Sequence, residues 1–217
     1  MIMFRDRRDA GTQLASRLNE YKDKKAVLLL ALPRGGVVVG FEIARYLKIP
    51  MDVLIVRKIG LPIDSELAVA AVSETGTVAL NDSIISAYGV TKKYITDEIL
   101  SQQKEIKERI DVYRNGRALP ELEDKIIILT DDGVATGATI KATITALRKE
   151  KLKRLIVALP VAPPPVAEEI GRMADELICI ETPSDFMSVG SYYRNFGQVT
   201  DEEVMGLLKE QTGGSHA

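Results

Sequence analysis

The chain of 217 residues is long enough for one α/β domain with a substantial core and a small appended subdomain. Its 29 basic and 31 acidic residues give a net charge of −2, so no charge excess indicates a nucleic-acid surface. There is no run of about 18 apolar residues and no basic-then-apolar leader, so we expect a cytoplasmic protein without a membrane span or signal peptide. The single cysteine and single histidine do not supply the ligands of a zinc site.

The first predicted elements are a helix and a strand. Residues 7–21 carry apolar side chains at helical spacing and predict an amphipathic helix over the core. The continuous apolar run Ala26–Leu32 predicts the first strand of the sheet, and after a short turn a helical stretch extends to about Leu47.

The turn between them, Pro33-Arg34-Gly35-Gly36, is typical of an anion-binding loop. Gly35 and Gly36 can expose backbone amides, and Arg34 offers a fixed cation to an oxyanion. The following GGVVVG does not have the G-x-G-x-x-G spacing, so dinucleotide binding is not favoured. A tight turn with a surface arginine remains the alternative.

The middle of the chain predicts a strand, a hairpin and a long helix. Met51–Val56 reads as a strand that is followed by Arg57 and Lys58, two cations that are either solvated or face a shared anion crevice. Glu66–Ser73 and Thr77–Leu80 predict a hairpin. Thr91 can cap a helix reaching about Val112, with isoleucines along one stripe and charges on a face that we expect to be solvated.

The central predicted strand is the unbroken apolar run Ile126–Leu129. It is short enough to be buried on both faces of a parallel sheet. Asp131 and Asp132 follow, and a dry sheet interior would not tolerate two acids. We therefore place them at the carboxyl end of the strand, where open α/β sheets bind ligands.

The loop 133–139 then leads into a helical pattern that continues to about Lys149. Two glycines, two hydroxyls and a helix N-terminus together suit a phosphate monoester. Acids for a diol beside amides for a phosphate predict a ribose 5-phosphate ligand. The alternatives are a phosphoacceptor strand, a structural turn, and the magnesium strand of a P-loop ATPase, although no G-x-x-x-x-G-K-[ST] cradle is present.

The last part of the chain predicts two more strands, Arg154–Pro160 and Glu176–Ile180, with a helix beginning in the proline run 163–165. Cys179 lies in an apolar run and is expected to be a small hydrophobe rather than a nucleophile, and His216 in the terminal tail is given no role. Beyond Thr182 the periodicity breaks. A short closing helix is expected at 201–210.

Several of these stretches resemble type I phosphoribosyltransferases. The string LTDDGVATGAT at 129–139 resembles their signature for phosphoribosyl pyrophosphate (PRPP), and Thr130 stands where an aliphatic residue is more usual. PRGG resembles their pyrophosphate loop, which often has an unusual peptide conformation, and RKIGLP at 57–62 is similar to the version in adenine phosphoribosyltransferases. With the VGxYYxxFxQ tail, the chain looks especially like bacterial and archaeal proteins of this family whose acceptor is not generally established.

This resemblance implies a doubly wound, mostly parallel α/β sheet in a single domain, 1–217. The core would span about 24–181, with a mobile hairpin loop over the ligand. A small hood over the nucleobase would be built from about 182–200 plus the N-terminal residues. Only Ser86 and Tyr88 offer themselves as catalytic residues in the mobile loop.

The resemblance also implies roles for individual residues. Ribose hydroxyls and Mg²⁺, the expected cofactor, would be held by Asp131 and Asp132, directly or through water. The 5-phosphate would be bound by Ala135, Thr136, Gly137, Ala138 and Thr139. The pyrophosphate would be bound by Arg34, Gly35, Gly36, Arg57 and Lys58. Catalysis by charge stabilisation would rest on Asp131, Asp132, Arg34 and Lys58. Phe186, Tyr192 and Tyr193 would contact the base, or would only pack the tail onto the core.

The implied activity is Mg²⁺-dependent transfer of phosphoribose from PRPP onto a nitrogenous base, with release of pyrophosphate. The partners would be PRPP and a base, without nucleic acid or membrane, and a homodimer is a further expectation. Two alternatives use the same site: a regulator that binds PRPP or a nucleotide without turnover, and a hydrolase or phosphorylase of phosphoribosyl compounds. The sequence does not name the base.

Overall fold

The computed structural model describes residues 3–64 and 67–213, with side chains up to residue 211. The expected start of the hairpin at Glu66 and the tail residue His216 lie outside the described residues. Within the described residues, no helix has the length and apolar character that crossing a membrane requires.

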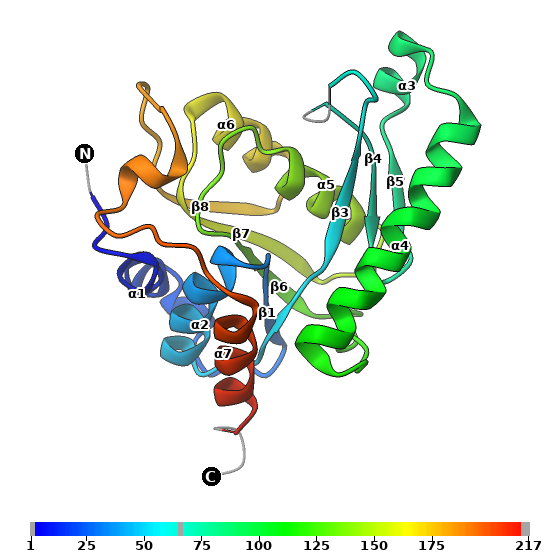
Figure 1. Cartoon of the computed structure of the whole chain (residues 1–217). Helices are drawn as coiled ribbons and strands as arrows, with labels where there is room; N and C mark the ends of the chain where they lie inside the picture. The colour runs from blue at the N-terminus through cyan, green and yellow to red at the C-terminus, as the bar shows by residue number, and fades with distance from the viewer. Residues whose placement is uncertain (1–2, 65–66, 214–217) are drawn as a thin grey trace.

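A parallel sheet of five strands forms the centre of the molecule (Figure 1). The strands, in spatial order, are β2 (Met51–Val53), β1 (Val27–Ala31), β6 (Ile126–Thr130), β7 (Arg154–Val161) and β8 (Glu176–Glu181). Every neighbouring pair is parallel, with Leu29 opposite Ile128 at the centre. The predicted α/β fold with a mostly parallel sheet is confirmed.

Helices cover both faces of this sheet, because alternate residues of each strand point to opposite sides. Leu29 and Ile128 belong to one apolar cluster, while Leu30 and Leu129 belong to the other. The first cluster is covered by α1 (Arg7–Arg17), α2 (Gly35–Leu47) and α7 (Asp201–Gly213), and the second by α5 (Ala138–Leu147) and α6 (Pro164–Met173). The sheet is therefore doubly wound.

A second, antiparallel sheet stands beside the core with its own two helices (Figure 1). Its strands are β3 (Val56–Gly60), β4 (Ala68–Ser73) and β5 (Val78–Leu80), and its helices are α3 (Asp82–Tyr88) and α4 (Lys92–Arg114). The pair β4 and β5 is the predicted hairpin, and Thr91 caps α4 through its hydroxyl, 3.2 Å from the amide of Tyr94.

The predicted strand Met51–Val56 is wrong in one respect, because the chain changes sheets within it. The amide of Leu54 donates to Ala31 O at 3.0 Å in the core, whereas the amide of Ile55 donates to the Glu74 carboxylate at 2.8 Å. Arg57 and Lys58 consequently lie inside β3, not beyond the carboxyl end of a core strand. Leu54, Ile55 and Val56 are all apolar and buried, so the sequence gives no signal of the change.

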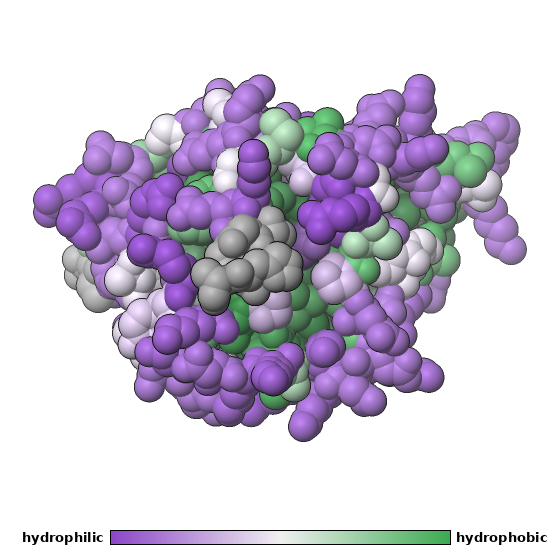
Figure 2. All heavy atoms as spheres, turned by 90° about the horizontal axis from the view of Figure 1, so that it is seen from below, coloured by the Kyte–Doolittle hydropathy of each residue, from purple (hydrophilic) through white to green (hydrophobic). Residues whose placement is uncertain are grey.

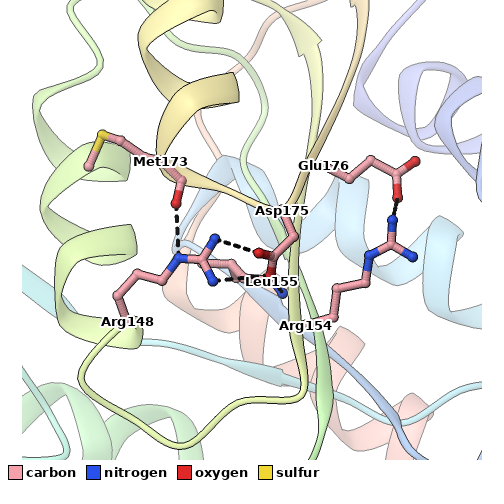
Figure 3. Close-up of polar contacts among 6 residues, drawn as sticks. All are labelled: Arg148, Arg154, Leu155, Met173, Asp175 and Glu176. Carbon is pink, nitrogen blue, oxygen red and sulfur yellow. Dashed lines mark hydrogen bonds and ion pairs between the residues drawn. The ribbon is translucent and has the colours of Figure 1, made fainter.

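At the amino ends of the strands, opposite the acid pair, charged groups link neighbouring elements (Figure 3). Arg148, at the end of α5, donates to both carboxylate oxygens of Asp175 at 3.0 Å and to Met173 O at 2.9 Å. Asp175 also accepts the amide of Leu155 at 2.7 Å. One carboxylate therefore links α5, the end of α6 and β7.

The N-terminal segment lies beside the segment between β8 and α7. The amide of Phe4 donates to Tyr192 O at 2.8 Å, and the amide of Arg194 donates back to Phe4 O at 2.9 Å. The segment between β8 and α7 contains one short 3₁₀ turn, η2 (Val189–Tyr192), and a second, η1 (Asn19–Tyr21), follows α1. Seen from below, the surface is mainly hydrophilic, with hydrophobic atoms visible between the charged side chains (Figure 2).

Candidate active site

The acid pair lies where β6 ends, as the sequence predicts. Thr130, the last residue of β6, is fully buried, and its hydroxyl donates to Ala158 O at 2.8 Å. This bond explains how a hydroxyl is tolerated at a position inside the sheet. Asp131 and Asp132 follow directly, and the Asp131 carboxylate accepts the amide of Asp132 at 2.8 Å.

The two carboxylates differ in electrostatic environment. Burial, together with the neighbouring charge of Asp132, raises the pKa of Asp131 well above its usual range. Burial also raises the pKa of Asp132, but the Arg7 guanidinium opposes that shift. The pair is therefore a site at which a cation or hydroxyl donors would relieve repulsion between like charges.

Glycines allow the N-terminus of α2 to approach the acid pair. A Cβ added to Gly35 would lie 1.9 Å from Asp132 Oδ2, and one added to Gly36 would lie 2.8 Å from the Cα of Asp131. No other residue type fits at this separation. The peptide between Pro33 and Arg34 is cis, which matches the unusual conformation that the resemblance implies for this loop.

The loop between β6 and α5 has the shape of an anion cradle. Gly133 and Gly137 have φ of 144° and 75°, in the region that favours glycine, and Gly137 is the N-cap of α5. The first amides of a helix have no acceptor within it, and that of Ala138 lies 3.3 Å from the Thr136 hydroxyl. Thr136 and Thr139 are exposed, so both hydroxyls are available to a phosphate.

Arg7, at the start of α1, is a site residue that the sequence did not indicate. Its Nε donates to Asp132 Oδ2 at 2.7 Å, and its NH1 donates to Gly197 O at 2.7 Å. The guanidinium also lies 3.9 Å from the centre of the Phe196 ring. An arginine in the first turn of an amphipathic helix gives no sequence signal of a partner 125 residues away.

The segment 182–200 packs over Asp131 and Asp132, and some of its aromatic rings are buried instead of facing a ligand. Tyr192 and Tyr193 are 2% and 5% exposed, and the Tyr193 hydroxyl donates to Asp132 O at 2.5 Å. Phe186 stacks on Tyr192 with 5.6 Å between ring centres and is partly exposed. Burial of the two tyrosines favours the packing alternative for them, and Phe186 and Phe196 keep exposed surface.

A cavity of about 140 Å³ brings predicted residues from three segments together. Arg34, Arg57 and Thr139 line it, and so do Arg109 and Tyr113 of α4. The charged face of α4 is therefore not simply solvated: Arg57 Nε donates to Gln102 of α4 at 3.1 Å. The solvated face expected for the whole helix is corrected on this side.

Lys58 does not share that placement. It follows Arg57 directly in β3, and successive residues of a strand point to opposite faces of the sheet. Lys58 is not among the residues that line the cavity of Arg34 and Arg57. Its expected contact with pyrophosphate stays a prediction.

A larger cavity of about 550 Å³ lies between the hairpin β4–β5 and α5. Thr136 and Ala138 of the loop 133–139 are among its lining residues, and so are alanines of the hairpin and α5. The start of α3 borders it at Asn81, Asp82 and Ser83, whereas Ser86 and Tyr88 are exposed further along the helix. No contact places Ser86 or Tyr88 at the acid pair among the described residues.

The acid pair suits a metal ion that arrives with a ligand. In residues 3–64 and 67–213 there is no cluster of three or more His, Cys, Asp or Glu side chains that could hold a metal. Mg²⁺ is commonly held by one or two carboxylates together with substrate phosphates. Asp131 and Asp132 fit that donor set. Cys179 is not a rival centre, because burial raises its pKa to about 11 and keeps the thiol protonated.

The comparisons agree with this geometry. The family model described as “Phosphoribosyl transferase domain” matches residues 5–196. Two Mycobacterium tuberculosis proteins, from strains CDC 1551 / Oshkosh and ATCC 25618 / H37Rv, are both named “Putative phosphoribosyl transferase”. Each is 41% identical over 208 residues, which cover 96% of this chain and 47% of the relative. The chain thus spans about half the length of these curated relatives.

A solved structure shows the same fold over nearly the whole chain. The crystal structure of the protein TT1426 from Thermus thermophilus has a TM-score of 0.87 and 39% sequence identity. The match covers 97% of this chain and 99% of that one. From the acid pair, the cradle and these matches together, the chain belongs to the phosphoribosyl transferase domain family.

Proposed function

We propose that the protein transfers phosphoribose from PRPP onto a nitrogenous base and releases pyrophosphate. One observation carries the proposal: Gly35, in the anion-type loop, is packed so closely on Asp132 that a single methyl group would collide with the carboxylate. A diol-binding acid pair and a diphosphate-binding loop are thereby held within the span of one small ligand. The cradle 135–139 supplies the third contact.

The proposed roles follow the chemistry of each group. Asp131 and Asp132 accept hydrogen bonds from the ribose hydroxyls. The amides and hydroxyls of Ala135–Thr139 bind the 5-phosphate at the N-terminus of α5. Arg34, Arg57 and the first amides of α2 bind the diphosphate.

Catalysis in such a site is mainly stabilisation of charge. As the bond between the ribose carbon and the diphosphate breaks, positive charge develops on the sugar and negative charge on the leaving group. Asp131 and Asp132 stabilise the first, and Arg34 and Arg57 stabilise the second. Asp131 and Asp132 would hold Mg²⁺, directly or through water, and would thereby place a positive charge that could neutralise part of the diphosphate charge.

A second function, a regulator that binds PRPP or a nucleotide without turnover, is supported by one contact. Arg7 already occupies Asp132 Oδ2 at 2.7 Å, so a ribose hydroxyl has to compete with an ion pair. The two tyrosines expected at the base are also buried. A hydrolase or phosphorylase would use the same site with water or phosphate as the acceptor, and product analysis separates it from a transferase.

Calorimetric titration of PRPP, with and without Mg²⁺, tests the shared part of these proposals. We expect saturable, Mg²⁺-dependent binding that the double variant Asp131→Asn/Asp132→Asn loses. Asp175→Asn is the matched control, because it removes a carboxylate at the amino end of β8, away from the carboxyl strand ends. Unchanged PRPP binding by the double variant would contradict the proposed site.

Pyrophosphate release against a panel of purine and pyrimidine bases then separates the functions. Release with one base supports the transferase, and saturable binding without release supports the regulator. The identity of the base, a homodimer and a cytoplasmic location stay predictions. So does the division into a core of about 24–181 and a hood of about 182–200 with the N-terminal residues in one domain.

A further inference from the structure

One face of α4 is turned toward the cavity of Arg34 and Arg57. Gln102, Glu105, Arg109 and Tyr113 follow one another at intervals of three or four residues, so they form a single stripe on the helix. Gln102 and Glu105 contact Arg57, and Arg109 and Tyr113 line the cavity of about 140 Å³. In Figure 1, α4 runs alongside β3 and ends near α7.

Arg109 is anchored through one of its three nitrogens. Its NH1 lies 3.1 Å from each carboxylate oxygen of Asp201 and 3.2 Å from the hydroxyl of Tyr113. That hydroxyl in turn donates to Asp201 Oδ1 at 2.6 Å. Within the described residues, Nε and NH2 of Arg109 have no hydrogen-bond partner, so the remaining N–H groups are available to another acceptor.

The cavity consequently gathers three guanidinium groups, those of Arg34, Arg57 and Arg109. Like charges around so small a space repel one another unless an anion lies between them. Glu105 pairs with Arg57 and Asp201 pairs with Arg109, so two carboxylates face three arginines and one positive charge is in excess. Guanidinium groups are suited to phosphate oxygens, because their planar donors can bind two oxygens at once.

We propose that Arg109 binds the diphosphate end of the substrate, with Tyr113 and Asp201 as positioning residues. This inference rests on the proposed function and adds an arginine from outside the sequence motifs. Asp201 is the first residue of α7, and α7 follows the tail segment that covers the acid loop. The setting of Arg109 therefore depends on the folded position of the tail.

Three probes separate the diphosphate end from the ribose phosphate end: PRPP, inorganic pyrophosphate and ribose 5-phosphate, each titrated calorimetrically with Mg²⁺ present. In Arg109→Gln, we expect affinity for PRPP and for pyrophosphate to fall about tenfold or more, because charge-assisted hydrogen bonds are lost. Affinity for ribose 5-phosphate should stay within about twofold of the native value. Lys107→Gln, an exposed cation on the opposite side of α4, is the matched control and should change none of the three.

The positioning role has its own readout. Tyr113→Phe keeps the charge of the site, and we expect pyrophosphate affinity to fall while ribose 5-phosphate affinity is kept. If Tyr113 acts through Arg109, the same substitution in an Arg109→Gln background has no further effect. An equal loss in both backgrounds would show that Tyr113 acts independently and would overturn its assigned role.

The outcomes for Arg109 separate this inference from the proposed function. Unchanged pyrophosphate affinity in Arg109→Gln, or an equal loss for ribose 5-phosphate, overturns the inference while PRPP binding by the native protein stands. Pyrophosphate binding that depends on Arg109, in a protein that binds neither PRPP nor ribose 5-phosphate, overturns the proposed function and supports the anion site. Arg109→Lys, which keeps the charge but not the planar fork, should show an intermediate affinity and serves if Arg109→Gln does not fold.

Discussion

At the acid pair, each carboxylate is restrained by a different neighbour. Burial raises the pKa of both; at Asp132 the paired Arg7 opposes this shift, whereas at Asp131 the charge of Asp132 adds to it. Such an arrangement costs folding free energy, and it persists at sites where a ligand later uses the charge. Gly35 is also tightly restrained, because its backbone lies so close to the Asp132 carboxylate that a Cβ would collide with it.

Gly35→Ala tests this close approach. The new methyl group would lie 1.9 Å from Asp132 Oδ2, so either α2 or the carboxylate must move. We expect the free energy of unfolding to fall by about 1–3 kcal/mol, the usual cost of overpacking, and PRPP affinity to fall with it. Denaturant unfolding and calorimetry measure the two effects. Gly206→Ala, whose Cβ meets nothing within 4 Å, is the control, and an equal response of both variants would contradict the steric explanation.

At the scale of elements, the sequence predicted buried strands, but it did not predict contacts between distant elements. The run Ile126–Leu129 predicted a central strand because a segment buried on both faces is apolar throughout. The stretch Met51–Val56, which is apolar except for Asp52, also predicted one strand, but the chain changes sheets within it. The acceptors of the Leu54 and Ile55 amides decide this change. The contacts of the polar stripe of α4 likewise depend on how β3 and α7 pack against that helix.

The junction of α5, α6 and β7 in Figure 3 gives a prediction at this scale. The hydrogen bond from Arg148 is the main cause that lowers the pKa of Asp175. Burial opposes it, and the amide of Leu155 adds a smaller lowering effect. Because the folded pKa is depressed, the stabilisation is present above the unfolded pKa of about 3.9 and is lost as the pH falls through the folded value. We expect Asp175→Asn to lower stability at neutral pH and to flatten its decline below about pH 4.

Thermal unfolding of native protein and Asp175→Asn between neutral and acidic pH measures this. Glu123→Gln is a suitable control, since that carboxylate is half-exposed and pairs with exposed Lys151 at 3.1 Å. Parallel stability curves for the native protein and Asp175→Asn would show that Asp175 has no part in the acid dependence.

At the scale of the whole molecule, the N-terminal residues pair with the segment before α7 that covers the loop of Asp131 and Asp132. Phe4 is fully buried, and its ring centre lies 5.3 Å from that of Tyr193, whose hydroxyl reaches Asp132 O. The pairing of Phe4 with Tyr193 therefore supports the segment that covers Asp131 and Asp132. Loss of this packing should affect both stability and the site.

Phe4→Ala removes a buried ring, and such substitutions cost about 3–5 kcal/mol. We expect that loss in denaturant unfolding, together with faster amide hydrogen exchange at Arg194 and Asn195, whose amides bond to Phe4 O and Arg5 O. Met3→Ala, at a neighbouring side chain that is 48% exposed, should change neither. Protection of the two amides that is unaffected by Phe4→Ala would contradict the link between the N-terminal residues and the segment before α7.

The sequence by itself determined the parallel sheet, the place of Asp131 and Asp132, and the glycine-bearing loops beside them. Those features depend on local requirements, namely burial on both faces, charge at a strand end and backbone freedom, which are written in consecutive residues. Only the tertiary structure decided that Arg7 pairs with Asp132, that Arg109 pairs with Asp201, and that Tyr192 and Tyr193 are buried. A single charge on an amphipathic helix carries no information about its partner, because the partner is chosen by how distant elements pack.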